Sequence, residues 1–184
     1  FEAKKRIGYL PEQPPLYMDM TVAEYLNFVM EIKKVKQKGK SHIDNIMSLV
    51  QIGDVKNRLI KNLSKGYKQR IGMAQALIGN PEVLILDEPT VGLDPKQIIE
   101  IRNVIKELGK EHTIILSSHI LPEVSAICER VIIINKGKIA AIDTPEHLSQ
   151  TLTNEKRIMV RVAGEQEQVI NCIRELEGVR YVEV

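Results

Sequence analysis

The chain has 184 residues, of which 43% are hydrophobic, and its formal net charge at pH 7 is +2. This length and composition predict a globular fold with one hydrophobic core and room for a small appendage. The near balance of charges argues against a nucleic-acid-binding surface, and no apolar stretch approaches the roughly 18 residues that a membrane-spanning helix needs.

The first 80 residues are predicted to form a strand, a loop and then helices. Ile7–Leu10 is a short apolar run typical of a strand, and Gln13 follows in a loop between two prolines. Residues 19–80 are predicted to be helical, because Thr21 with Glu24 three residues later is typical of a helix start. The first two expected helices span residues 21–34 and 41–50.

A third helix begins with a segment suited to bind an anion. The segment is Leu63-Ser-Lys-Gly-Tyr-Lys-Gln-Arg70, and apolar residues at helical spacing follow it. Ser64 and Gly66 lie at the helix start, where free backbone N–H groups and the helix dipole favour negative charge.

The most informative segment is Leu84-Ile-Leu-Asp-Glu-Pro-Thr90. The apolar run Val83–Leu86 does not alternate, which is typical of a strand buried on both faces. Asp87 and Glu88 follow where Pro89 prevents the strand from continuing. Ligands bind at the carboxyl ends of strands in open α/β sheets, so these acids are candidates for holding Mg²⁺ or activating water. The alternative for these residues alone is a strand followed by an exposed acidic turn.

A helix and a second strand follow this acidic pair. Asp94 is suited to cap the helix, with Pro95 at its first position and Gly109 at its end. Thr113–Ser118 is an apolar strand, and His119 lies directly after it. We therefore expect His119 to lie at the same edge of the sheet as the two acids.

The remaining residues are predicted to finish this domain and to open another. Strands are expected at Val131–Ile134 and Lys138–Ile142, and a short helix at Glu146–Thr151. Beyond Asn154 a strand, a helix and a strand are expected, at residues 157–162, 165–177 and 179–184. This β-α-β unit carries no chemical motif, so an interaction or regulatory appendage is the favoured interpretation.

Taken in order, these segments resemble the motifs of the ATP-hydrolysing domain of ABC transporters. Gln13 falls on that family's glutamine loop, Leu63–Arg70 on its signature, Val83–Pro89 on its Walker B strand, Gly92-Leu93-Asp94 on its D-loop and His119 on its switch histidine. The resemblance implies an α/β fold of the P-loop NTPase type, with a parallel sheet and an inserted helical subdomain. It assigns residues 1–150 to a partial ATPase domain, with 19–80 as the helical subdomain, and 151–184 to the start of an accessory domain.

The resemblance also implies ATP and Mg²⁺ as cofactors and a role for each motif. The expected metal ligands are Asp87 and Gln13. The expected catalytic residues are Glu88, as general base for the attacking water, and His119, which would contact the γ-phosphate. The residues expected to bind nucleotide are Gln13, Ser64, Gly66 and Asp94, the last three at an interface with a second ATPase subunit, identical or different.

Two features depart from the family pattern. The usual signature is Leu-Ser-Gly-Gly-Gln, but here Lys65 precedes Gly66 and Tyr67 replaces the glutamine. This variant resembles those of exporters with separate ATPase and membrane subunits. The Walker A phosphate loop, Gly-x4-Gly-Lys-Ser/Thr, is absent, because the one Gly-Lys-Ser (residues 39–41) has Lys34 where the first glycine is needed. We therefore expect a fragment that lacks its phosphate loop and is inactive alone.

The family topology yields a specific expectation for the sheet. Strands 7–10, 83–86 and 113–117 should be parallel neighbours, with strand 131–134 one place removed. The gap between the last two is where the phosphate-loop strand of the family would lie.

The implied partners are transmembrane permease subunits, at the inner face of the cell membrane, and no nucleic acid. One alternative is a soluble ABC-type ATPase, but the stretch between Gln13 and Ser64 shows no sustained heptads of the chromosome and repair type. Another alternative is a non-catalytic partner-binding module, against which the presence of Glu88 and His119 argues. The transported substrate is chosen by the membrane subunits and is not encoded here.

Overall fold

The computed structural model describes residues 2–35, 40–152, 160–176, 178, 179, 181 and 182. The chain divides into two compact units, Phe1–Pro145 and Glu146–Val184, and the boundary lies a few residues before the predicted one. None of the described helices has both the length and the apolar character needed to cross a bilayer.

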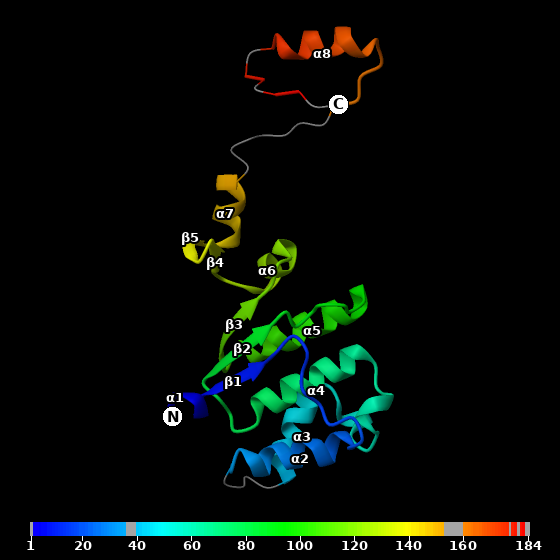
Figure 1. The fold of residues 1–184 in the computed structure, drawn as a ribbon, viewed down its shortest axis with the longest axis vertical. Helices are drawn as coiled ribbons and strands as arrows, with labels where there is room; N and C mark the ends of the chain where they lie inside the picture. The colour runs from blue at the N-terminus through cyan, green and yellow to red at the C-terminus, as the bar shows by residue number, and fades with distance from the viewer. Residues whose placement is uncertain (1, 36–39, 153–159, 177, 180, 183–184) are drawn as a thin grey trace. The chain divides into compact units, whose positions relative to one another are not determined.

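Three parallel strands form the sheet of the first unit (Figure 1). The strands are β1 (Ile7–Leu10), β2 (Val83–Asp87) and β3 (Thr113–Ser117), in the order β1-β2-β3. The predicted parallel neighbours are therefore confirmed. The register places Asp87 opposite Ser117, at the carboxyl ends of β2 and β3.

Only one face of this sheet is buried. Leu84 and Leu86 in β2 are each 1% exposed, whereas Tyr9 in β1 is 51% and Ile115 in β3 is 55% exposed. The expectation that Val83–Leu86 is buried on both faces is therefore wrong for the described residues. The burial of β2 alternates because its second face is not covered by the part of the chain that the structure describes.

Helix α4 (Lys65–Leu77) packs closely on β1. A Cβ atom on Gly8 would lie 2.5 Å from the carbonyl oxygen of Ala76, and one on Gly72 would lie 2.6 Å from Leu10 Cδ1. Any larger residue at either position would push the helix away from the strand.

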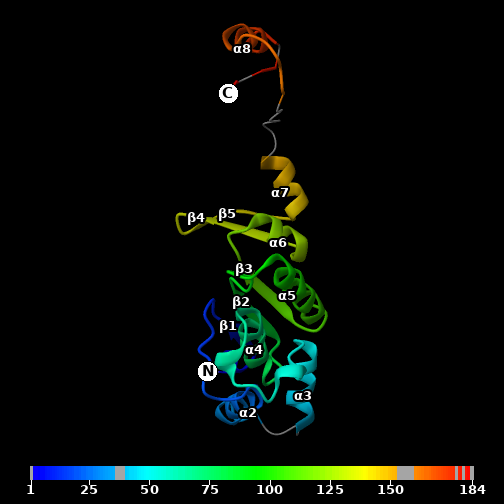
Figure 2. The same cartoon turned by 90° about the vertical axis from the view of Figure 1, so that its right-hand side faces the viewer.

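The helical region follows β1 and packs around α4. It comprises α2 (Val22–Ile32), α3 (Lys40–Leu49) and the 3₁₀ turns η1 (Gly53–Val55) and η2 (Ile60–Asn62). Both views show α2 and α3 on the side of α4 that faces away from the sheet (Figures 1 and 2). The predicted capping box is present, since Thr21 N–H donates to Glu24 Oε2 at 2.8 Å and Glu24 N–H to Thr21 Oγ1 at 3.3 Å. Helix α2 ends before Lys34, whose φ of 51° is left-handed.

Helix α5 (Pro95–Leu108) connects β2 to β3 as predicted. Asp94 Oδ1 accepts a hydrogen bond from Gln97 N–H at 2.9 Å, and Pro95 occupies the first helical position. Ile101 and Leu108 on its inner side are 0% and 1% exposed. A short helix that was not predicted, α1 (Glu2–Lys5), precedes β1, and α6 (Leu121–Ile127) follows β3.

Strands β4 (Val131–Asn135) and β5 (Lys138–Asp143) form a separate antiparallel hairpin. Lys136 and Gly137 both have positive φ, as the tight turn of such a hairpin requires. Within the described part of the chain β3 and β4 are not paired, in agreement with the predicted gap between them. Four of the five isoleucines of this hairpin are 46–69% exposed: Ile132, Ile134, Ile139 and Ile142.

The second unit holds most of α7 (Pro145–Leu152) and all of α8 (Gln166–Arg174). Both helices were predicted, although α8 is shorter than expected. The strands of the expected β-α-β unit are not formed at residues 160–162, 179, 181 and 182, and their other residues lie outside the described ones. Val160 and Tyr181 are 63% and 78% exposed. An alternating pattern makes a strand only where a partner strand supplies hydrogen bonds, which these residues do not find.

Candidate functional site

Asp87 is held at the carboxyl end of β2 by side chains from both neighbouring strands. Ser117 Oγ, at the end of β3, donates a hydrogen bond to Asp87 Oδ1 at 2.5 Å. The Tyr9 hydroxyl of β1 lies 3.4 Å from Asp87 Oδ2, a longer contact. These donors orient the carboxylate and leave lone pairs for further partners.

Glu88 lies in a strained turn directly after Asp87. Its φ of 44° is left-handed, which is uncommon for a residue other than glycine and tends to occur at functional sites. The turn is held because Glu88 N–H lies 3.2 Å from both the carbonyl oxygen and Oγ of Ser117. Ser117 therefore orders both acids at once.

The Glu88 side chain meets His119, the residue predicted to share its edge of the sheet. His119 Nδ1 lies 2.8 Å from Glu88 Oε1, and the side chains are 68% and 20% exposed for His119 and Glu88. The hydrogen bond to Glu88, together with its negative charge, raises the pKa of His119 above its ordinary value. The second carboxylate oxygen, Glu88 Oε2, is buried and has no hydrogen-bond partner among the described residues.

A buried polar cluster supports the segment between these residues. The Thr90 hydroxyl donates to Glu123 Oε2 in α6, and Arg102 Nη2 of α5 lies 3.7 Å from Glu123 Oε1. The Glu123 side chain is 7% exposed. The cluster joins the turn after Glu88 to the helix that follows His119, so it limits how far the two can separate.

The starts of α4 and α5 form a second group of predicted site residues. Ser64 Oγ caps α4 by accepting from Tyr67 N–H at 3.4 Å, and Asp94 caps α5 as described. The two helix starts touch, because a Cβ on Gly66 would lie 2.9 Å from Gln97 Cδ. No hydrogen bond or ion pair between described residues links this group to Glu88.

Gln13 lies in an exposed bend after β1. The structure does not bring it into hydrogen-bond contact with Asp87 or Glu88, although all three residues are described. The structure therefore joins Glu88 to His119 directly and leaves Gln13 apart from both.

Several residues that the sequence reasoning missed contribute to these groups. Ser117 was recognisable as the last residue of a predicted strand, but its pairing with Asp87 depends on the register of β2 and β3. Gly92 has a φ of 67°, and a Cβ there would lie 2.2 Å from Lys65 Nζ. Lys65 of the altered signature therefore reaches the turn before Asp94, a contact with no signal in local sequence.

The described residues could hold Mg²⁺ only if water and substrate phosphate oxygens supply its remaining ligands. Among the described residues, no three histidine, cysteine or acidic side chains group together as a ready-made metal centre. Asp87 supplies an ordered carboxylate, and Mg²⁺ usually takes one or two carboxylates together with waters and substrate phosphate oxygens. The unpartnered Glu88 Oε2 beside it suits the acceptance of a hydrogen bond from water.

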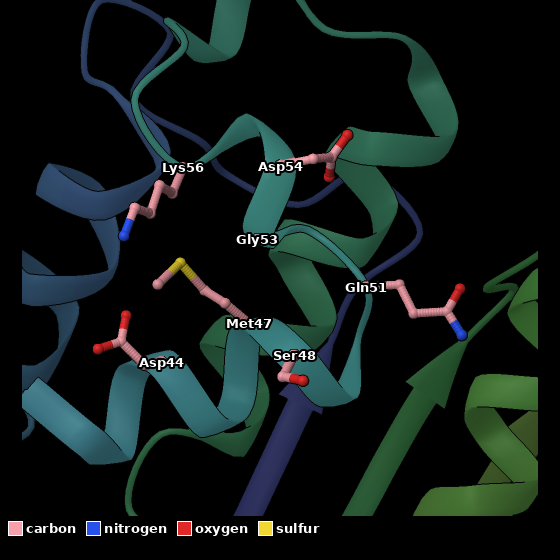
Figure 3. Close-up of a pocket in the computed structure, with 7 residues that line it drawn as sticks. All are labelled: Asp44, Met47, Ser48, Gln51, Gly53, Asp54 and Lys56. Carbon is pink, nitrogen blue, oxygen red and sulfur yellow. The ribbon is translucent and has the colours of Figure 1, made fainter.

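A surface pocket lies elsewhere, in the helical region (Figure 3). It has a volume of about 390 Å³ and none of the predicted site residues lines it. The residues that line it come from α3, η1 and their flanks: Asp44, Met47, Ser48, Gln51, Gly53, Asp54 and Lys56.

Comparison with known proteins identifies the family of this chain. The family described as "ABC transporter" matches residues 2–91. The lipopolysaccharide export system ATP-binding protein LptB of Haemophilus influenzae is 32% identical over 167 residues, which are 89% of this chain and 68% of LptB. The chain belongs to the ATP-binding proteins of ABC transporters. The bacitracin transport ATP-binding protein BcrA of Bacillus licheniformis is 37% identical over 171 residues, covering 92% of this chain and 55% of BcrA.

A solved structure of this ABC family supports the fold. CbiO1 from Clostridium perfringens, described as part of the ABC transporter complex CbiONQ, matches with a TM-score of 0.72 and 27% identity. The match covers 93% of this chain and 64% of CbiO1. The α/β architecture with a parallel sheet is therefore that of the ABC ATPases. The chain spans about half the length of the curated ABC relatives that it matches.

Proposed function

We propose that this chain belongs to a subunit that hydrolyses ATP and thereby energises transport across a membrane. The observation that carries the proposal is the Glu88–His119 pair at the carboxyl end of β2. One oxygen of Glu88 meets His119 at 2.8 Å while the other is buried and unpartnered. A carboxylate in this state is suited to accept a proton from an attacking water.

Each neighbouring residue has a role in this proposal. Glu88 is the general base, and His119 orients its carboxylate and contacts the γ-phosphate. Asp87, kept in place by Ser117 Oγ at 2.5 Å, is a ligand for Mg²⁺, and Gln13 approaches the metal from its exposed loop. When bound, Mg²⁺ neutralises charge on the phosphates.

A complete site requires a second ATPase subunit, identical or different. Ser64 and Gly66 at the start of α4 and Asp94 at the start of α5 would contact ATP held by that subunit. Support comes from the contact between the two helix starts and from their lack of described bonds to Glu88. The helix dipole and free N–H groups of α4 favour phosphate there.

The proposed partners include transmembrane permease subunits, at the inner face of the cell membrane. The names of LptB, BcrA and CbiO1 connect each of those proteins with export, transport or a transporter complex. Nucleic acid is not expected as a partner, because the formal net charge is +2.

We further propose that the 184 residues alone do not bind or hydrolyse ATP appreciably. The sequence contains no Gly-x4-Gly-Lys-Ser/Thr, so it offers no phosphate loop. The exposed sheet face, with Ile115 at 55% exposure, and the hairpin isoleucines offer an apolar surface for the strand that precedes such a loop.

Substitution of the proposed base tests the function. In the complete subunit, Glu88→Gln should leave ATP binding intact and lower the hydrolysis rate by at least about a hundredfold, because the amide keeps the shape but not the basicity. Glu111→Gln is the matched control, since Glu111 is exposed. A near-normal rate of ATP hydrolysis in Glu88→Gln would exclude Glu88 as the base.

A further inference from the structure

Tyr67 joins the start of α4 to a distant turn of the helical region. Its backbone N–H donates to Ser64 Oγ at 3.4 Å, and its hydroxyl donates to Asp54 Oδ2 in η1 at 2.8 Å. The hydrogen bond to Asp54 is the largest of the effects that raise the pKa of Tyr67. The same residue is thus bound to the helix cap at one end and to η1 at the other.

Arg70, one turn further along α4, reinforces this attachment. Its guanidinium carbon lies 5.9 Å from the centroid of the Tyr67 ring, a distance suited to a cation–π contact. Arg70 Nη1 lies 3.4 Å from the carbonyl oxygen and from Oε1 of Gln51, and Nη2 pairs with Glu100 Oε2 in α5. The Arg70 side chain is 9% exposed, so these bonds are largely shielded from water.

The partners of these two residues lie at the surface pocket of the helical region. Gln51 and Asp54 both line it, and Figure 3 shows the Asp54 carboxylate directed toward the ribbon of α4. Helix α4 also meets α5, at the close contact of Gly66 with Gln97. The first two turns of α4 therefore contact both η1 and α5.

The cap at Ser64 is the weak bond of this arrangement. At 3.4 Å it is longer than an ordinary hydrogen bond. The Ser64 hydroxyl can donate its proton to a phosphate while its oxygen still accepts from Tyr67 N–H, but any movement of that oxygen toward the phosphate lengthens this bond further. The shorter bond from the Tyr67 hydroxyl to Asp54 is on another side of the helix start and does not depend on the cap.

We infer that Tyr67 is a positioning residue: its hydrogen bond to Asp54 keeps the first turn of α4 in place when Ser64 turns to the nucleotide. The inference rests on the proposed function. It assigns a use to the residue that replaces the glutamine of the usual signature. If the inference holds, the position of η1, which contains Asp54, determines the direction in which the N-terminus of α4 points.

A double-mutant cycle in the complete subunit tests the inference. Tyr67→Phe and Asp54→Ala should each lower kcat by about tenfold, the effect of losing one hydrogen bond to a carboxylate, with little change in KM for ATP. The double variant should be no slower than either single variant, because both remove the same bond. Thermal unfolding of each variant establishes that it is folded.

A second measurement, the ionisation of Tyr67, tests the hydrogen bond between Tyr67 and Asp54 without an activity assay. The phenolate absorbance of the complete subunit, minus that of Tyr67→Phe, reports the ionisation of Tyr67. Asp54→Ala should lower the Tyr67 pKa toward its ordinary value of 10.0. An unchanged Tyr67 titration in Asp54→Ala overturns the inference.

Matched controls separate the inference from the proposed function. Tyr181→Phe changes a tyrosine that is 78% exposed, and Asp44→Ala changes an exposed acid that lines the same surface pocket. Both should keep wild-type kcat. If the wild type hydrolyses ATP but the Tyr67 and Asp54 variants match these controls, or if their effects multiply in the double variant, only the inference fails. A wild type without ATPase activity refutes the proposed function itself.

Discussion

Replacement of Lys33 by methionine should destabilise the first unit, because it removes hydrogen bonds to the carbonyl oxygens at the end of α4. Lys33 lies at the end of α2, and its Nζ donates to the carbonyl oxygens of Gln75 at 2.7 Å, Ile78 at 3.0 Å and Ala76 at 3.5 Å. Carbonyls in the last turn of a helix lack partners within the helix. The lysine therefore caps α4 from a neighbouring helix.

The magnitude follows from these bonds and from the burial of the ammonium group. Two of the three distances are those of well-formed hydrogen bonds. Burial lowers the pKa of Lys33 to about 8, so part of the gain from these bonds is offset by desolvation. We expect Lys33→Met to lower the free energy of unfolding by about 2 kcal/mol.

Urea unfolding followed by circular dichroism at pH 7 measures this loss. The midpoint should fall by about 1 M in Lys33→Met. Lys34→Met is the control, because Lys34 is the exposed neighbour whose ammonium group makes no hydrogen bond to the described residues, and the free energy of unfolding should change by less than about 0.5 kcal/mol. Equal stability of wild type and Lys33→Met would refute the capping role.

The pH dependence of the same experiment has a defined sign. The folded protein has a lower Lys33 pKa, about 8, than the unfolded chain, whose value is near 10.5. Between these values the unfolded chain binds more protons, so a rise in pH favours the folded wild type. The stability gap to Lys33→Met should widen from pH 8 to pH 10.5, and a gap that narrows would contradict the burial argument.

Three further outcomes are expected. Isothermal titration of the isolated chain should show no saturable ATP binding at millimolar concentration, because losing three charge-assisted bonds to phosphate weakens binding by roughly three decades; micromolar affinity would mean that the nucleotide site is misplaced. An NMR titration of His119 should give a pKa above 6.5, and this pKa should fall toward 6.5 in Glu88→Gln. The contact stabilises the folded protein fully below pH 6.5, and this stabilisation is lost as the pH rises through the raised pKa of His119. Identical His119 titrations in the wild type and in Glu88→Gln would refute the pairing. Gly92→Ala should cost at least about 1 kcal/mol of unfolding free energy in urea, since its φ of 67° disfavours alanine and its Cβ would displace Lys65; a neutral change would contradict this geometry.

The sequence was most informative where neighbouring residues decide the outcome. The capping box of Thr21 and Glu24, the cap at Asp94 and the proline at the start of α5 were all predicted and are confirmed. Each depends on groups three residues apart or fewer, so the local sequence contains both partners. The parallel order of the three strands also followed from the motifs.

The sequence also predicted that His119 lies at the same edge of the sheet as Glu88, through a rule of topology, whereas the direct contact between the two side chains was not predicted. Both residues follow strands whose carboxyl ends lie at one edge of the sheet, and the structure places their side chains 2.8 Å apart. The catalytic roles of these residues stay predictions, as do those of Gln13, Ser64 and Asp94.

Only the tertiary structure decided the contacts that depend on register or on packing between distant elements. The sequence alone determined that Asp87 and Glu88 end a strand. The structure added that Ser117 binds both, that Tyr67 reaches Asp54 and that Lys65 reaches Gly92. The same cause explains the two differences from the prediction: the burial of β2 on both faces, and the absence of a strand at the described residues on either side of α8, which are 160–162, 179, 181 and 182. Burial and strand pairing depend on what another segment places alongside, which no pattern within the strand itself records.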